Sequence, residues 1–153
     1  MEVLNQFMST LISWSYVCMH HSMRNFFHYS IKSGLSMSQI GALFWVSHKG
    51  NCAVSDIGEV LGITSAAASQ MLERLVQQGL VLRSEDPTDR RMKQIALTDK
   101  GRQVLQESIQ ARQSWLSDLA EALSDREKEE VTAALRVLID KASHMGQPVE
   151  ADR

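Results

Sequence analysis

Small and hydrogen-bonding side chains are concentrated between residues 64 and 74. They are Thr64, Ser65, Ala66, Ser69, Gln70 and Arg74. A glutamine amide can make two hydrogen bonds to an adenine edge, and serine hydroxyls suit phosphates or base edges. Small side chains near the start of a helix also let its backbone approach the bases closely. The alternative is a helix face that is merely solvated.

A second cluster of charged side chains follows in a polar, turn-rich stretch. Arg90 and Arg91 are candidates for insertion into a minor groove, where the negative potential is concentrated. Asp89 cannot favour a phosphate, but it can hold an arginine side chain in place. Arg83 and Lys93 flank the stretch, and they fit a phosphate contact as well as they fit a solvated strand.

The first cluster needs a helix to position it. Thr64 is a favourable N-cap, and Gly79 is suited to follow the end of a helix that runs to Gln78. The predicted buried face consists of Ala67, Ala68, Met71, Leu72, Leu75 and Val76. A shorter helix over residues 54–61 stops at Gly62. An earlier helix opens with an S-x-x-Q capping box.

The second cluster needs a hairpin. Residues 80–83 and 93–97 have the composition of two short strands, with the polar stretch between them. Three short helices followed by such a hairpin form the winged helix-turn-helix arrangement. The predicted fold class is therefore mainly α with a small β-hairpin wing.

Apolar helical patterns flank this core on both sides. Residues 1–34 carry apolar side chains three and four positions apart, many of them Met or aromatic. That stripe is richer in Met and aromatic side chains than a lone surface helix requires, so we expect it to be buried against a partner. Thr98 caps a long helix whose apolar side runs to Leu123, and Ser124 with Glu127 forms a second capping box.

The charge of the chain is unevenly distributed. The net charge of −2 by itself argues against a nucleic-acid binder. Residues 63–102, however, hold seven Lys and Arg against five Asp and Glu, whereas residues 103–153 hold six against ten. The local field decides where a phosphate backbone docks, so the middle of the chain is the better candidate.

The bulk composition narrows the class of protein further. No apolar run approaches the ~20 residues of a membrane span, and we find no signal peptide. The two cysteines fit neither a disulfide framework nor a zinc motif, which together favours a cytoplasmic protein without a metal site or cofactor. We find no nucleophile elbow, phosphate loop or paired carboxylates, so we do not expect an enzyme.

Two specific motifs lie between Ile57 and Gly101: D-P-T-D-R-R at residues 86–91 and L-T-x-x-G at residues 97–101. With these motifs, the segment resembles the MarR family of bacterial transcription regulators. The resemblance implies that Ser65, Ala66, Ser69, Gln70 and Arg74 lie on the recognition helix. It also makes Asp89 and Arg91 the wing pair, with Arg90 as a flanking cation.

The same resemblance implies a homodimer that binds double-stranded DNA at a near-palindromic operator, and a repressor that a small aromatic or amphipathic effector releases. The expected organisation is an N-terminal dimerisation helix (1–34), a winged helix-turn-helix domain (35–98), C-terminal dimerisation helices (99–145) and a disordered tail (146–153).

Two departures from the family pattern occur. Ala53 stands where a capping Thr or Ser is usual, with Ser55 as a substitute cap, and Gly58 replaces the usual Ala, which loosens its helix by roughly 0.5–1 kcal/mol.

Three alternatives remain open at this stage. An effector cavity could be lined by Tyr16, Met19, Met23, Phe27, Phe44 and Trp45, or these residues could simply pack in the core. Cys18 could act as a redox-sensing thiol, although a small buried core residue is the simpler interpretation. Finally, the protein could be an interaction module that has lost DNA binding. We expect Cys52 to be partly exposed.

Overall fold

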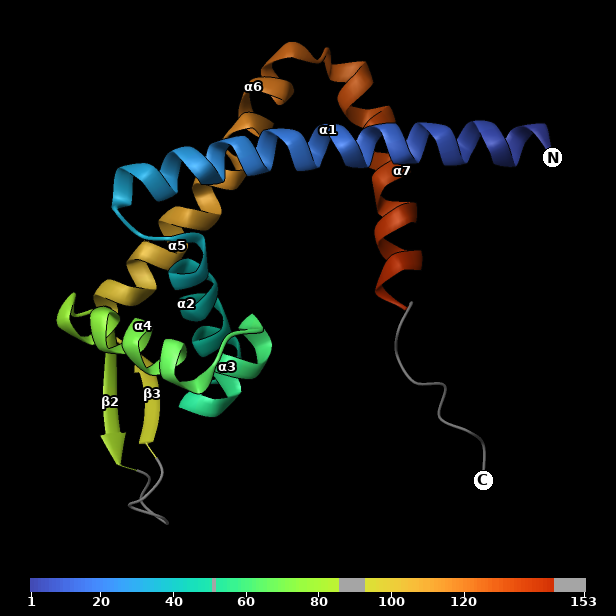
Figure 1. Cartoon of the computed structure of the whole chain (residues 1–153). Coiled ribbons are helices and arrows are strands. Elements are labelled where there is room, and N and C mark those ends of the chain that lie inside the picture. Colours follow the sequence, from blue (N-terminus) through green and yellow to red (C-terminus); the bar gives the residue numbers. More distant parts are fainter. Residues whose placement is uncertain (51, 86–92, 145–153) are drawn as a thin grey trace, which may run out of the picture. The chain divides into compact units, whose positions relative to one another are not determined.

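The computed structural model describes residues 1–50, 52–85 and 93–144. Its elements in chain order are α1 (Glu2–Ser33), α2 (Met37–Lys49), β1 (Cys52–Ala53), α3 (Val54–Leu61), α4 (Ser65–Gln77), β2 (Val81–Glu85), β3 (Lys93–Leu97), α5 (Asp99–Gln113), α6 (Trp115–Ala122) and α7 (Asp125–Ser143). The prediction of a mainly helical chain with a small β-hairpin is confirmed (Figure 1). The chain divides into two compact units, Met1–Ser114 and Trp115–Arg153.

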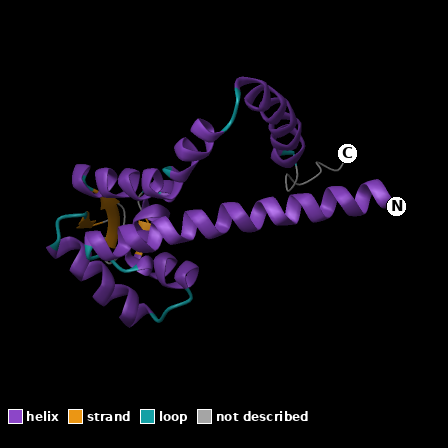
Figure 2. Ribbon diagram, turned by 90° about the horizontal axis from the view of Figure 1, so that it is seen from above, coloured by secondary structure: helices purple, strands orange, loops and turns teal. Residues whose placement is uncertain are grey.

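The first unit contains a small antiparallel sheet with strand order β1-β3-β2. The hairpin pairs Val81 with Leu97, and β1 adds a third strand by pairing Cys52 with Ile95. Figure 1 shows β2 and β3 side by side and extending beyond α4, and Figure 2 shows the strands in orange. The sequence did not predict β1, because two residues carry no periodicity. The expectation that Cys52 is partly exposed was wrong, since its strand position buries it to 4% exposure.

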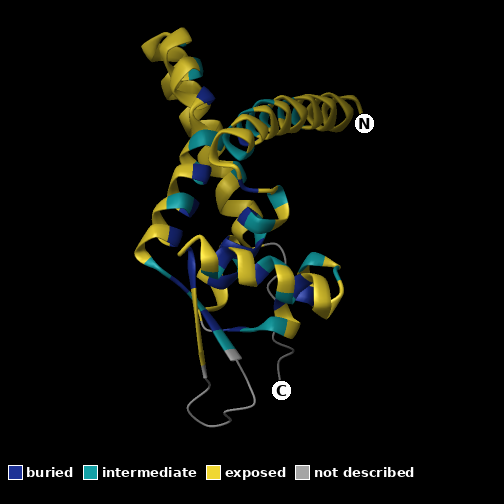
Figure 3. Cartoon of the chain, turned by 60° about the vertical axis from the view of Figure 1, so that its left-hand side comes forward, coloured by how far each residue is buried: buried dark blue, intermediate teal, exposed yellow. Residues whose placement is uncertain are grey.

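One hydrophobic core holds the helices of the first unit against this sheet. Its most deeply buried members are Ile40, Leu43, Ile57, Leu72, Leu75 and Ile95. They come from α2, α3, α4 and β3. Figure 3 shows buried positions in dark blue on both the helices and the strands. Burial of such side chains stabilises a fold by about 1.5–3 kcal/mol each.

The predicted helix starts are confirmed by their caps. The Thr64 hydroxyl accepts a hydrogen bond from the Ala67 N–H at 3.2 Å. The capping boxes that begin at Ser36 and Ser124 are both formed. The expectation for Ser55 was wrong. The N-cap position is Ala53, and Ser55 lies inside the helix, where its hydroxyl donates to the Asp56 carboxylate at 3.2 Å. That carboxylate also accepts from the Ala53 N–H at 3.2 Å.

Two further details differ from the sequence prediction. Ala67 is exposed rather than buried on α4, because the side of the helix that faces the core is the one that carries Ala68, Leu72 and Leu75. The long helix after Thr98 is divided at Ser114 into α5 and α6. Ser114 donates a hydrogen bond to the Ala111 carbonyl at 3.0 Å, which offers the chain a local alternative to the helical ladder.

The two flanking regions leave many apolar side chains exposed. The C-terminal half of α1 packs on α5, but Phe7, Ile12, Tyr16 and Met19 are each 47–72% exposed. In the second unit, α7 has no buried residue. No helix in the described part of the chain is long and apolar enough to cross a membrane.

Candidate functional site

The outer face of α4 carries the residues that the sequence singled out. Thr64, Ser65, Ala66, Gln70 and Arg74 are exposed, and Ser69 is half-buried. The opposite face buries Ala68, Leu72 and Leu75 to 1% exposure or less. The core therefore fixes the rotation of α4 and leaves a face of small and hydrogen-bonding side chains towards solvent.

A tight turn between α3 and α4 sets the angle at which α4 leaves the core. Gly62 ends α3 with a left-handed backbone (φ 63°), and the Ile63 N–H donates to the Gly58 carbonyl at 3.0 Å. A Cβ on Gly58 would lie 3.3 Å from the Ile63 carbonyl oxygen and 3.6 Å from the Ala68 side chain. Gly58 therefore lets the two helices approach closely, which sequence reasoning had counted only as a loss of helix propensity.

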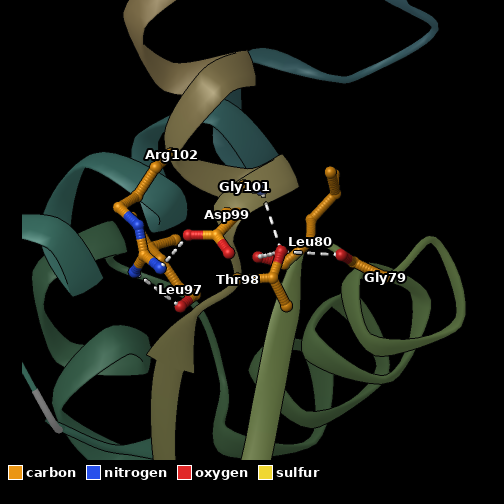
Figure 4. A network of polar contacts seen from close by, with 7 residues as sticks. All are labelled: Gly79, Leu80, Leu97, Thr98, Asp99, Gly101 and Arg102. Carbon is orange, nitrogen blue, oxygen red and sulfur yellow. Dashed lines mark hydrogen bonds and ion pairs between the residues drawn. The ribbon is translucent and has the colours of Figure 1, made fainter.

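The end of α4 is fastened to β2 and α5 by a polar network that Figure 4 shows. The Thr98 hydroxyl donates to the Gly79 carbonyl at 2.7 Å and accepts from the Gly101 N–H at 2.9 Å. The Thr98 N–H donates to the Leu80 carbonyl at 3.1 Å. A Cβ on Gly101 would overlap that same carbonyl oxygen. The spacing of L-T-x-x-G thus places a cap and a close backbone contact in one helical turn.

Two cationic side chains add hydrogen bonds at the junction of α4, β2 and α5, the region that contains Gly79, Leu80, Thr98 and Gly101. The Lys100 ammonium donates to the Gln78 carbonyl at 2.9 Å, where α4 ends and its carbonyl groups lack helical partners. The Arg102 guanidinium donates to the Leu97 carbonyl at 3.0 Å and pairs with Asp99. Sequence reasoning missed both residues, since only the fold brings their side chains to these carbonyl groups.

Strand β2 of the hairpin lies next to α4, but the tip of the hairpin lies outside the described residues. Asp89, Arg90 and Arg91 belong to that tip, so their predicted roles stay predictions. On the described part of the hairpin, Arg83 lies 4.0 Å from the Glu73 carboxylate of α4. This ion pair was not predicted.

The six residues predicted to line an effector cavity do not meet in one hollow of the first unit. Tyr16, Met19, Met23 and Phe27 line a shallow hollow along α1. Trp45 lines a different one, with Lys49 5.4 Å from the centre of its ring. Phe44 is 51% exposed and lines neither of these two hollows. An effector site built from all six residues stays a prediction.

The environment of Cys18 does not favour a reactive thiolate. Burial raises the pKa of the Cys18 thiol, and a backbone hydrogen bond lowers it by less. Burial, with the charge of Asp56, also raises the pKa of Cys52. A sensing thiol needs a lowered pKa, so the environments of Cys18 and Cys52 both disfavour that role. Among the described residues, no group of three or more His, Cys, Asp or Glu side chains could hold a metal ion.

The helices, the turn and the hairpin define a winged helix-turn-helix protein with α4 in the place of the recognition helix. A profile of the MarR family matches residues 33–92. The HTH-type transcriptional regulator YfiV of Bacillus subtilis is 31% identical over 108 residues, which cover 71% of this chain and 68% of YfiV. The chain therefore belongs to the MarR family, and its relatives are transcription regulators rather than enzymes, as predicted.

Two further comparisons add detail. The transcriptional repressor MprA of Escherichia coli strain K12 is 28% identical over 116 residues, covering 74% of this chain and 66% of MprA. A mutant of S. aureus MepR, solved with a bound oligodeoxyribonucleotide, has the same fold with a TM-score of 0.68 and 21% identity, covering 90% and 97% of the two chains. The chain spans 61% and 65% of the length of two other curated relatives.

Proposed function

We propose that this protein is a homodimeric transcription repressor that binds a near-palindromic DNA operator and is released by a small aromatic or amphipathic effector. The observation that carries the proposal is the outer face of α4. Thr64 caps its start, and Ser65, Ala66 and Gln70 are exposed beside it. A helix with this face fits a major groove about 12 Å wide, with Gln70 available for an adenine edge.

The hairpin supports the same proposal. The β2–β3 pair is in register up to Glu85 and Lys93, the two described residues between which the predicted tip falls in the sequence. By their types and their place in the sequence, Arg90 and Arg91 suit a minor groove, and Asp89 suits the task of orienting one of them. The name of MprA and the oligodeoxyribonucleotide bound to the MepR mutant support repression and DNA binding.

The exposed apolar side chains of α1 support the homodimer. Tyr16 is 72% exposed and Met19 is 67% exposed, an arrangement that costs free energy in water unless a partner covers it. A second copy of the chain supplies the same stripe by two-fold symmetry. An effector held near this region would change the separation of the two α4 helices and so lower operator affinity. A protein with this function acts in the cytoplasm.

A selection experiment tests the proposal. We expect the wild-type protein to enrich a palindromic sequence from random duplexes and to bind it with an affinity that falls steeply as salt rises. Arg91→Ala should weaken that binding by about 1–3 kcal/mol, whereas Arg136→Ala on α7 should leave it unchanged. Absence of binding at low salt would favour the interaction-module alternative instead.

A further inference from the structure

The ion pair between α4 and β2 joins the two elements that approach DNA in the proposed function. Glu73 lies on the outer side of α4, three residues after Gln70 and therefore on the same helical face. Arg83 lies in the middle of β2, opposite Ile95 of β3. The Arg83 Nη1 and the Glu73 Oε2 are 4.0 Å apart.

The geometry of a DNA duplex determines what this pair would face. A helix in a major groove and a hairpin tip in the adjacent minor groove lie on either side of one sugar-phosphate strand. Side chains between α4 and the hairpin therefore lie along that strand. The Arg83 side chain is 38% exposed and the Glu73 side chain is 56% exposed, so both are accessible to phosphates.

The pair contributes little to folding. It is long and solvent-exposed, and such pairs add little net stability because solvent screens them and ordering the side chains costs entropy. A carboxylate on a surface that faces phosphates also repels them. The position of Glu73 therefore has its main electrostatic consequence when DNA approaches.

We propose that Glu73 competes with the DNA phosphates for Arg83 and thereby limits the sequence-independent affinity of this protein for DNA. The proposal rests on the proposed function, since it places α4 and the hairpin on the duplex. In the free protein Arg83 is shared with Glu73. On DNA a phosphate competes with the carboxylate for Arg83, so Arg83 neutralises that phosphate only in part, and the charge of Glu73 opposes the strand. Glu73 is a positioning residue that acts through Arg83 and contacts no base.

The experiment measures binding to a duplex of arbitrary sequence over a range of salt concentrations. The variants are Glu73→Gln, Arg83→Gln and the double substitution, and Glu129→Gln on α7 makes the same charge change at an exposed site of the second unit. We expect Glu73→Gln to bind about three-fold tighter at low salt, because a repulsive charge is lost and Arg83 is freed. Its log–log salt slope should steepen by a value approaching 0.9, as expected for one more neutralised phosphate.

A double-mutant cycle separates this role from a merely structural one. Arg83→Gln should weaken binding more in the Glu73→Gln background than in the wild-type background, because the arginine is then fully available to phosphate. Equal losses in the two backgrounds, or no tightening by Glu73→Gln on a duplex that the wild type binds, would overturn this assignment alone. Failure of the wild type to bind any duplex would overturn the proposed function and this assignment with it.

Discussion

The junction of α4, β2 and α5 and the helix α1 differ in where their partners come from. At the junction, Thr98 and Lys100 find backbone carbonyl partners within the same unit. Along α1, Tyr16 and Met19 remain mostly exposed. The first region is complete in a single chain, whereas in the proposed dimer a second copy covers the other. Changes at the junction should therefore destabilise the fold, and changes on α1 should dissociate the proposed dimer.

The largest effect is expected at Gly101. Gly101→Ala should destabilise the fold by about 3 kcal/mol, because the new Cβ meets the Leu80 carbonyl and the backbone must shift. Urea denaturation measures the change. Gly41→Ala is the matched control within α2, where the nearest atom to an added Cβ is a Leu61 methyl group at 3.4 Å. It should be neutral or stabilising by up to about 1 kcal/mol. Equal losses in the two variants would contradict the close contact at the junction.

The second largest effect concerns the exposed stripe of α1. Met19→Asp should raise the dimer dissociation constant at least 100-fold, because burial of a methionine contributes about 1.5–3 kcal/mol and a two-fold dimer loses it twice. Sedimentation velocity measures the change. Thr10→Asp places the same charge nine residues earlier, on the opposite side of the helix, and should leave the dimer intact. A Met19→Asp protein that still sediments as a dimer would remove α1 from the interface.

A smaller effect is expected for the cap of α5. Thr98→Val keeps the shape of the side chain but removes its hydrogen bonds to the Gly79 carbonyl and the Gly101 N–H. The free energy of unfolding should fall by about 1–2 kcal/mol. Thermal denaturation tests this, with Thr132→Val as a control on exposed α7. A Thr98→Val variant as stable as the wild type would show that the cap does not contribute.

The smallest effect is a pH dependence at the start of α7. Hydrogen bonds from Ser124 lower the pKa of the Glu127 carboxyl below its usual value. Because the folded-state pKa is lower than the unfolded one, this contribution is present above the ordinary carboxyl pKa. It is lost as the pH falls through the lowered value. Amide hydrogen exchange in the first turn of α7 should therefore lose protection in acid beyond the intrinsic rate change, and Glu127→Gln should abolish that dependence. An unchanged profile in Glu127→Gln would contradict it.

The parts of the fold that follow from local patterns were predictable. Thr64 and Thr98 are of a residue type that favours the N-cap and directly precede their helices, so the sequence shows these caps directly. The strand β1 was not predictable, because two residues carry no periodicity and their partners in β3 are distant in the sequence. The capping role of Asp56 was missed for a related reason, since its carboxylate reaches back to a residue that looks unable to cap.

The residues of the candidate site could be predicted from the sequence, but the contacts that hold them in place could not. The outer face of α4 follows from helical spacing once its buried side is known, although Ala67 was assigned to the wrong side. The reason for Gly101 and the pairing of Glu73 with Arg83 depend on the approach of separate segments, which no local pattern encodes. The roles of Asp89, Arg90 and Arg91 still rest on the sequence.

The central claim is that two copies of α4 occupy successive major grooves on one face of a duplex. Hydroxyl-radical footprinting on the selected operator tests it most directly. We predict two symmetric protected half-sites whose centres lie roughly one helical turn, about 34–36 Å, apart, with protection lost in Gln70→Ala and Arg91→Ala together. A single asymmetric protected patch, or protection that survives both substitutions, would contradict the account.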